Sequence, residues 1–556
     1  MWKGLLIALA FPLIFMGCSN EETDANENSN DDAVVEHGDI APSITILSST
    51  PEANHTQYEA ANMAAAEWRE LGLDVTVGPI EFNTMVDRVF NDEDHDFDVY
   101  TIGWSGRAER LDPDMFTYSI LHSSNAGPGG NNSSGFIHDE FDELAAAQRQ
   151  EMDIDKRREM IFETQEILAD EVPFVTTYIP TFVQAYNNER FTDIPLMVGE
   201  GIFSEWLPYY ATPLTDDKVM RVGATYDLNT LNPLDASTAY EWRILRLIYD
   251  KLVRINLEGE TTPAAASGWE VVDDTTVDVF LREGMTFHDG QPVTAEDVKF
   301  SFDFQIEYNP GYFQAFTDPI ESIEVVDSST VRFNLSEPYA PFVNNTLAQI
   351  PIIPMHYWEN VMEEEGLASP ADFPNLEPVG SGPMTFNHWR RGEEVSMSTN
   401  NDFYEEIKID GIIYRLYGQS EGIMAGLERQ DIDTLSDPLI PAHIHNSRDI
   451  DHLNITEVGS IGFQYIGFNL RRAPFDNKAF RQALAHTVDF DTIVDAHLEG
   501  FGGMGGAGLN INDANQFWHN PNVERPVYDP EQARQILADA GYTWDDDGNL
   551  RLPVGN

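Results

Sequence analysis

The sequence predicts an α/β fold, because segments typical of buried strands alternate with segments typical of helices. Ser43–Leu47 and Asp98–Gly103 are apolar runs of strand length, and Leu73–Val77 alternates apolar and polar residues. Gln57–Leu71 carries apolar residues at helical spacing and is followed by Gly72, a frequent helix stop. The alternation predicts an α/β layer with a parallel component.

The chain is strongly acidic. It has 32 basic and 95 acidic residues among 556, a formal net charge of −63. This balance excludes nucleic acid as a partner, because phosphate binding needs clustered Lys and Arg. The acidity could form a functional patch, or it could be a general surface property that keeps a protein hydrated at high salt. Because the acids are spread along the whole chain, we favour the second and expect an exported protein of a halophile.

The N-terminal region has the pattern of a secretory signal. One lysine, an apolar run from Gly4 to Met16 and a small residue precede Cys18, the only cysteine. We expect a signal peptide over residues 1–17, lipidation of Cys18, and an acidic tether over residues 18–40. A transmembrane anchor is the alternative, but the run is short for a span. The predicted location is extracytoplasmic, either lipid-anchored to the outer face of the cell membrane or periplasmic.

Several longer motifs indicate a family. Phe280–Phe300, Pro378–Phe386, Phe480–Asp489 and Tyr528–Tyr542 follow one another along the chain. Together they resemble motifs of the extracellular solute-binding proteins of the peptide/nickel type, family 5, which supply ABC importers. The resemblance extends over nearly all of residues 41–556. It implies two α/β lobes around a cleft, the fold of type II periplasmic binding proteins, with an extra domain inserted in the first lobe.

The order of the segments departs from that family. A long further segment should follow the motif at 528–542, but only Thr543–Asn556 remain, and the missing part resembles residues 44–206. The sequence therefore predicts a circularly permuted family member. Residues 549–556 and 41–47 should then lie near each other in one lobe.

The resemblance implies a division of the chain into domains. Residues 41–181 and 469–556 would form the second lobe, domain III. Residues 182–262, with a connector at 208–217, and residues 379–468 would form domain I. Residues 263–378 would be the inserted domain II.

Candidate ligand contacts in the second lobe follow a predicted strand. Trp104 would supply a flat apolar wall, within a loop that the family directs at the ligand. Arg107 stands where peptide-binding members often carry an aspartate, and a guanidinium suits a carboxylate or phosphate. Arg110 has the same capacity. The alternative for Arg107 is a simple ion pair with Glu109 or Asp112.

Further candidates come from three other segments. Asn131 lies in a Gly/Asn loop, Tyr226 and Asn229 lie in the family's first cleft-lining loop, and Asn469 ends an apolar strand. That strand, Phe463–Asn469, matches the strand that crosses between the lobes, so we expect it to be both hinge and pocket floor.

Other patterns give no reason to propose catalysis, a cofactor or a metal. Gly500–Gly505 fits Gly-x-Gly-x-x-Gly but follows a predicted helix, so we interpret it as a mobile loop. His443 and His445 could share a strand face, but no third metal ligand is identifiable. No nucleophile elbow, zinc-protease helix or phosphate loop occurs.

The resulting hypothesis is a membrane-tethered binding protein of an ABC importer, not an enzyme. It would capture a peptide or related small solute by hinge closure and deliver it to permease subunits, and Arg107 makes an anionic ligand one of the candidates. The alternative is a lipid-anchored surface hydrolase or interaction protein that retains the scaffold.

Overall fold

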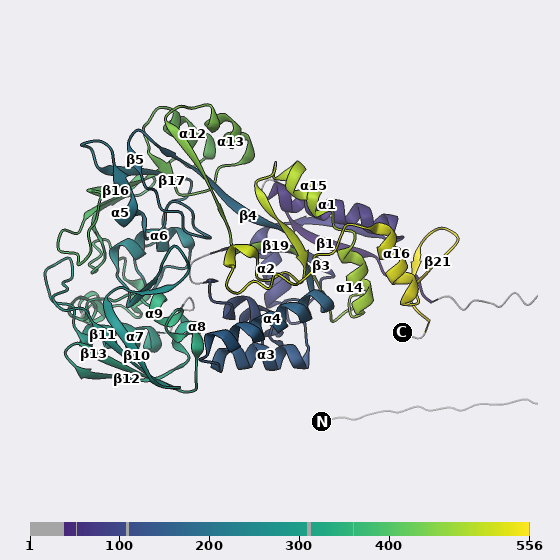
Figure 1. Cartoon of the computed structure of the whole chain (residues 1–556), viewed down its shortest axis with the longest axis horizontal. Helices are drawn as coiled ribbons and strands as arrows, with labels where there is room; N and C mark the ends of the chain where they lie inside the picture. Colours follow the sequence, from purple (N-terminus) through teal and green to yellow (C-terminus); the bar gives the residue numbers. More distant parts are fainter. Residues whose placement is uncertain (1–37, 52, 107–109, 309–312, 360, 555–556) are drawn as a thin grey trace, which may run out of the picture.

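The computed structural model describes residues 38–554, apart from residues 52, 107–109, 309–312 and 360. Two bodies lie side by side along the long axis of the molecule and are joined by the long strand β4 (Figure 1). The predicted class, α/β with two lobes, is confirmed.

The three strands and the helix predicted between residues 43 and 103 are confirmed. They are β1 (Ile44–Ser49), α1 (His55–Glu70), β2 (Val75–Ile80) and β3 (Val99–Trp104), and β1 pairs in parallel with both β2 and β3. The Asn54 side chain caps α1 by accepting from the backbone N–H of Gln57. Trp68 and a row of alanines bury one face of α1.

The second lobe combines both ends of the described chain, residues 38–180 and 460–554. Strand β19 (Phe463–Phe468) pairs antiparallel with β3, and β20 (Gly502–Ala507) pairs with β4 (Phe174–Asn187). Trp68 Nε1 donates to Thr487 Oγ1 at 3.0 Å, and Gln57 Nε2 donates to Gln464 Oε1 at 2.8 Å. The two segments also share both hydrophobic clusters of this lobe, since each cluster contains residues from both. The other elements of this lobe are α2 (Phe82–Val86), η1 (Asp87–Asn91), η3 (Met115–Ser119), η4 (Ser123–Asn125), α3 (Asp139–Gln150), α4 (Ile154–Glu171), α14 (Lys478–Ala485), α15 (Phe490–Thr492), η7 (Ile493–His497), η8 (Asp513–Asn515), α16 (Pro530–Asp539), β21 (Thr543–Trp544) and β22 (Leu550–Arg551).

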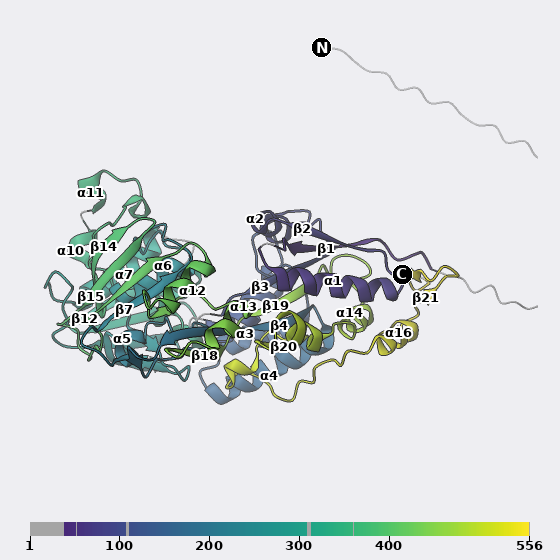
Figure 2. The same ribbon diagram turned by 90° about the horizontal axis from the view of Figure 1, so that it is seen from above.

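The two ends of the described chain meet at the tip of this lobe. Ile40 forms a bridge with Arg551, and the Ala41 N–H donates to the Leu550 carbonyl at 2.8 Å. The expected proximity of these segments is confirmed. The tip and its β21–β22 hairpin lie far from the first lobe in both views (Figures 1 and 2).

The first lobe is built from residues 181–459. Its main sheet has the order β14-β15-β16-β7-β17-β4, with β18 on the other side of β4, and a separate four-stranded sheet has the order β10-β11-β13-β12. The strands are β5 (Phe191–Thr192), β6 (Thr212–Pro213), β7 (Val219–Ala224), β8 (Val253–Ile255), β9 (Thr261–Pro263), β10 (Ala266–Asp273), β11 (Thr276–Leu281), β12 (Ile320–Asp327), β13 (Thr330–Leu335), β14 (Met384–Arg390), β15 (Glu394–Thr399), β16 (Gly411–Leu416), β17 (Thr434–Leu435) and β18 (Leu453–Gly459). The helices are α5 (Leu207–Tyr210), α6 (Ala239–Ile248), α7 (Ala295–Tyr308), α8 (Gln314–Thr317), η5 (Ala340–Phe342), α9 (Thr346–Gln349), α10 (Met355–Trp358), α11 (Val361–Glu365), η6 (Pro370–Asp372), α12 (Ser420–Glu428) and α13 (Pro441–Arg448).

Strand β4 is the element that crosses between the lobes. Its residues up to Pro180 pair with β19 and β20 in the second lobe, and from Thr181 onward it pairs with β18. The chain returns between Gly459 and Phe463, at the junction of β18 and β19. The interpretation of Phe463–Asn469 as the crossing strand was wrong, because β19 pairs with β3 inside the second lobe.

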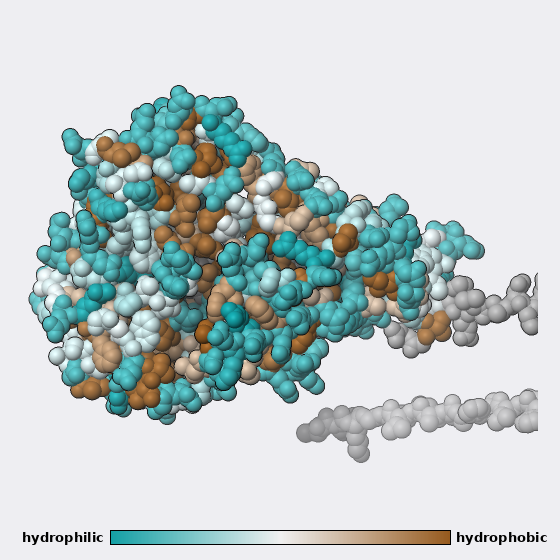
Figure 3. All heavy atoms as spheres, viewed as in Figure 1, coloured by the Kyte–Doolittle hydropathy of each residue, from teal (hydrophilic) through white to brown (hydrophobic). Residues whose placement is uncertain are grey.

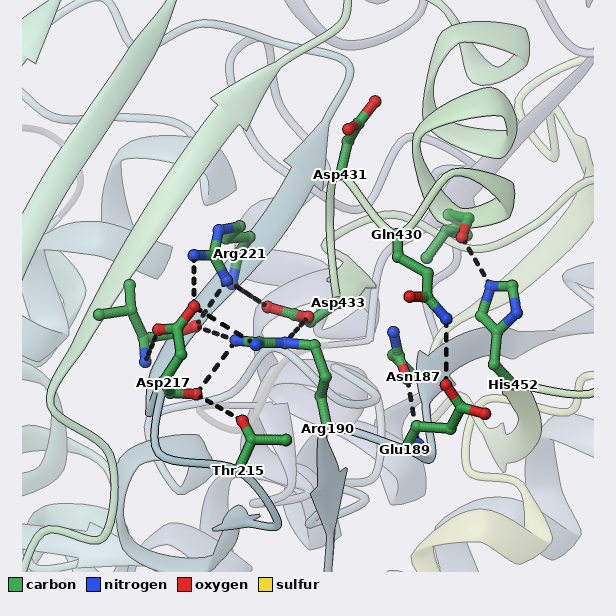
Figure 4. A network of polar contacts seen from close by, with 12 residues as sticks. Asn187, Glu189, Arg190, Thr215, Asp217, Arg221, Gln430, Asp431, Asp433 and His452 are labelled. Carbon is green, nitrogen blue, oxygen red and sulfur yellow. Dashed lines mark hydrogen bonds and ion pairs between the residues drawn. The ribbon is translucent and has the colours of Figure 1, made fainter.

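A polar network holds the connector at 208–217 in the first lobe (Figure 4). Asp217 contacts Arg221 at 2.7 Å and Arg190 at 3.3 Å. Both arginine residues also contact Asp433, through Arg190 Nε at 2.6 Å and the Arg221 N–H at 2.8 Å. Burial raises the pKa of Asp433, whereas the hydrogen bond from Arg221 lowers the pKa of Asp217. The segments before and after the connector are therefore tied to the same sheet.

Two local interpretations are corrected. Most of Gly500–Gly505 lies in strand β20 and is not a loop, because small residues there permit close pairing with β4. His443 and His445 lie on helix α13 and not on a strand. In the part of the chain that the structure describes, no three potential metal-ligating side chains come together. Of the described helices, none has the length and apolar composition needed to cross a membrane.

Candidate functional site: a cavity between the lobes

A cavity of about 440 Å³ lies where the two lobes face each other. Ser105 and Gly106 line it from the second lobe, and Phe182 lines it from β4. The rest of the wall comes from the first lobe, above all from α6. On the face shown in Figure 3, apolar residues gather between the two bodies, while hydrophilic residues cover much of the outer surface.

Helix α6 presents aromatic and cationic side chains to this cavity. Tyr240, Trp242, Arg243 and Arg246 all line it. A capping box starts the helix, in which the Glu241 carboxylate accepts from the Thr238 N–H at 2.9 Å. Because the first turn is fixed, the face of α6 that carries these four side chains is held toward the cavity.

The charged groups of the cavity wall occur as ion pairs. Arg246 Nη1 contacts both carboxylate oxygens of Glu200, at 2.7 and 2.8 Å. Lys251 Nζ lies 3.1 Å from Glu205 Oε2. Both glutamates are at least 94% buried, with exposed fractions of 6% and 5%. The wall thus offers charges of both signs, each close to an opposite charge.

Arg243 forms a third pair with Asp437 behind the cavity. Its Nη1 donates to Asp437 Oδ1 at 3.0 Å, and Thr225 Oγ1 donates to Oδ2 at 2.7 Å. Burial acts to raise the pKa of Asp437, but Arg243 and the hydrogen bonds outweigh it, so the pKa is lowered. Burial, with Asp437 nearby, raises the pKa of Tyr240 to about 12. Tyr240 is therefore a neutral hydrogen-bonding group at neutral pH.

The structure brings some of the predicted second-lobe residues together. Trp104 ends β3 and lines a small void with Asn131, Tyr100 and Tyr465. The void measures about 10 Å³, at most enough for one water molecule. The Arg110 guanidinium lies 5.6 Å from the Trp104 ring centre, and its Nη1 donates to the carbonyl of Ser105 at 2.7 Å.

Arg110 thus supports the backbone of a residue that lines the inter-lobe cavity. Arg107, the predicted charge anchor, lies outside the described residues. Its role stays a prediction.

The remaining predicted residues have structural contacts. Tyr226 is 56% exposed and stacks on Tyr240 at 4.6 Å between ring centres. Asn229 donates to Glu241 at 3.0 Å and so supports the start of α6. Asn469 is fully buried, and its amide donates to the carbonyls of His95 and Phe97. None of Tyr226, Asn229 and Asn469 lines the cavity, and a direct ligand contact by any of them stays a prediction.

Sequence reasoning missed the residues that form most of the cavity wall. Glu200, Glu205 and Lys251 come from loops with no recognisable motif. The α6 face could have been found, because Thr238 and Glu241 have capping-box spacing and Arg243 and Arg246 follow three residues apart.

Comparison with known proteins identifies the family. The family model for bacterial extracellular solute-binding proteins, family 5, middle region, matches residues 260–555, which is more than half of the chain. The chain belongs to this family. Curated relatives of this family 5 protein include the di/tripeptide-binding protein 1 of Pseudomonas aeruginosa, 27% identical over 316 residues that cover 53% of this chain and 58% of the relative.

Other relatives differ in the ligand that their names give. The oligopeptide-binding protein AppA of Bacillus subtilis is 28% identical and covers 55% of this chain and 56% of its own. Heme-binding protein A of Haemophilus influenzae is 28% identical, with 53% and 56% covered. Among solved structures, NikZ from Campylobacter jejuni in complex with Ni(L-His) is 23% identical, with a TM-score of 0.48 over 62% of this chain and 66% of that one.

The chain spans little more than half the length of these curated relatives. Their names describe binding proteins and not enzymes. This agrees with the prediction that the chain is not an enzyme.

Proposed function

We propose that this family 5 protein is the substrate-binding component of an ABC importer. It captures a small solute between its lobes and delivers it to permease subunits. The observation that carries the proposal is the inter-lobe cavity, which has walls from both lobes and lies beside two chain crossings, β4 and the β18–β19 junction. A ligand that contacts both lobes favours their closed arrangement, because its affinity differs between the two states.

The cavity favours a short, zwitterionic solute such as a small peptide. Its volume of about 440 Å³ lies toward the lower end of small-molecule sites, which hold roughly 300–1,000 Å³. The Glu200–Arg246 and Glu205–Lys251 pairs place both signs of charge at the wall. A ligand ammonium and carboxylate can each exchange with a member of such a pair. The predicted anion contact by Arg107 would add to this selection.

Binding to a panel of dipeptides and tripeptides tests the proposal. Isothermal titration should detect at least one ligand, and Lys251→Met should weaken its affinity tenfold or more because a cavity cation is lost. Lys408→Met, at an exposed site of the same lobe outside the cavity, is the control and should bind as the wild type does. Equal affinity in Lys251→Met would place the ligand elsewhere. Cleaved peptides detected by mass spectrometry would instead support the hydrolase alternative.

Export and anchoring are part of the proposal. We expect the signal peptide at 1–17 to be removed and Cys18 to be lipidated, which holds the protein at the outer face of the membrane. Labelling of cells with a radioactive fatty acid should mark the wild type and not Cys18→Ala; equal labelling would reject the anchor. The surface acidity suits a halophile, so the melting temperature should rise with added salt.

The permuted order is also a proposal. It is supported by the shared core of residues 38–180 and 460–554, the adjacency of Ile40 and Arg551, and the tied connector at 208–217. The fold thus has one continuous second lobe although its two segments lie at opposite ends of the sequence.

A further inference from the structure

Besides the two connections through β4 and the β18–β19 junction, the lobes also meet through side chains at a separate place. Asn344 of the first lobe donates through Nδ2 to Asp112 Oδ2 of the second lobe at 2.8 Å. Asn344 stands two residues before α9, and the last two residues of α9, Ala348 and Gln349, line the inter-lobe cavity. The contact is therefore close along the chain to the cavity wall.

Asp112 is held firmly within its own lobe. Arg157 donates to both of its carboxylate oxygens, at 2.8 and 2.7 Å, and the exposed fractions of the two residues are only 4% and 2%. Gln148 accepts from Arg157 Nε at 2.9 Å and so fixes the guanidinium in turn. The oxygen that meets Asn344 is thus already oriented and already neutralised by its arginine.

Two neighbouring pairs complete the contact. The Arg149 guanidinium lies 5.1 Å from the ring centre of Tyr339 in the first lobe, and its Nε lies 3.2 Å from Asp114. Gln150 Nε2 lies 3.4 Å from Glu337 Oε2. All three contacts come from the 112–114 turn and the α3–α4 pair on one side and from residues 337–344 on the other.

These three contacts form a patch whose position relative to the chain connections determines whether lobe motion affects it. In Figure 1, β4 joins the two bodies along their upper part, while α3 and α4 approach α8 lower in the view. No covalent connection among the described residues runs through the patch, so a rotation of the lobes about β4 and the β18–β19 junction must separate it. The patch joins polar groups and the buried ring of Tyr339 by noncovalent contacts alone. Asn344 Oδ1 has no hydrogen-bond partner among the described residues.

We propose that this patch is a latch that holds the lobes of the ligand-free protein together beside the cavity. The inference rests on the proposed function, because it assigns a closing contact to that same site. With the latch formed, the two cavity walls are already near each other, and the ligand has less ordering to impose. Opening the latch admits the ligand, and its re-formation supports the closed state.

The test measures the distance between the lobes without any ligand. Two nitroxide labels are placed at exposed positions, Glu140→Cys on α3 and Glu321→Cys on β12, in the full chain carrying Cys18→Ser. Pulsed electron–electron double resonance then gives the distribution of distances between the two labels. We expect the population with separated lobes to grow severalfold in Asn344→Ala, which removes the donor to Asp112. It should grow further in Asn344→Asp, which sets a second carboxylate against Asp112.

A matched control is available in the same domain. Among the described residues, the Asn334 side chain hydrogen-bonds only to Ser322 and Glu324 of its own sheet, so Asn334→Ala should leave the distances unchanged. Unchanged melting temperatures show that the Asn344 variants are folded, and Tyr339→Ala provides an independent opening variant. Identical distributions in the wild type, Asn344→Asp and Tyr339→Ala would overturn the latch. That result would not affect the proposed function, which fails instead if no solute binds.

Discussion

Arg243 joins the ligand cavity to the core of the first lobe. It lines the cavity, pairs with Asp437 and lies 5.6 Å from the Tyr240 ring centre. Its exposed side-chain fraction is 12% and that of Asp437 is 18%, so water screens the pair only in part. Removing the cation therefore leaves a mostly buried carboxylate with weaker compensation.

Arg243→Met should lower the free energy of unfolding by roughly 1–3 kcal/mol at pH 7. Because the folded pKa of Asp437 lies below the ordinary value of 3.8, its pairing stabilises the wild type above that pH and is lost as pH falls through the folded pKa. The difference between variant and wild type should therefore shrink below about pH 4. Urea unfolding at pH 7 and at pH 3.5 measures it.

The exposed pair of Arg429 and Asp431, 62% and 48% exposed, supplies the control. Arg429→Met should leave the urea midpoint unchanged at both pH values, because water screens an exposed pair. A loss in Arg243→Met that does not depend on pH would contradict the role assigned to the pair.

Single residues were only partly predictable. Trp104 was proposed because a bulky aromatic residue after a strand suggests a wall, but it lines only the small void, and its ligand contact stays a prediction. The carboxylates at 200 and 205, which do line the inter-lobe cavity, have no distinguishing neighbours in sequence. Asn469 shows the opposite problem. A polar residue at the end of an apolar strand suggested a ligand contact, but two backbone carbonyls at the end of the same sheet take up its amide.

At the scale of elements, the pairing of β20 with β4 requires glycine residues in β20. A Cβ atom at Gly505 would lie 1.8 Å from the Thr176 carbonyl oxygen of β4, closer than any real contact. The glycine-rich segment thus serves close approach between two strands, and its sequence pattern alone resembles a flexible loop.

Gly505→Ala should destabilise the protein by about 1–3 kcal/mol or more, because either β20 or β4 must shift. Gly268→Ala is the control, since Gly268 lies in β10 with no atom within 4 Å of an added Cβ. Its effect should stay within about 1 kcal/mol. Denaturant midpoints measure both, and equal midpoints would show that β20 pairs less tightly than the structure indicates.

Elements with strong periodicity were predicted well. The segment from β1 to β3 agrees with the expected strands and helix, because burial on one face leaves a clear pattern in sequence. The crossing strand was missed because β4, with 14 residues, alternates between two different environments and has no single pattern. The role of β4 as the crossing strand depends on its pairing with β18, β19 and β20, which lie far from it in sequence.

The whole molecule can be tested by restoring the segment order proposed for the family. In such a chain Lys218 comes first, Leu552 is joined to Asp39 by a short linker, and Asp217 comes last. The Leu552 N–H donates to the Asp39 carbonyl at 2.8 Å, so the new join needs little extra chain. Moving a break between exposed loops changes only loop closure, and we expect a stability within about 2 kcal/mol of the original.

Circular dichroism and thermal melting measure the result. A chain opened inside β4, between Val183 and Gln184, should fail to reach the native spectrum, because it cuts the strand shared by both lobes. If the rearranged chain also failed to fold, the permutation proposal would lose its support.

The adjacency of Ile40 and Arg551 fixes the place at which the N-terminal segment joins the folded body. Any upstream segment leaves the folded body at the remote end of the second lobe, beside the β21–β22 hairpin. If that segment is fastened to a bilayer, as proposed, the attachment point lies on the second lobe, at the end remote from the first. The proposed tether would then join the body far from the α6 wall, and closure of the lobes around a ligand would not strain it.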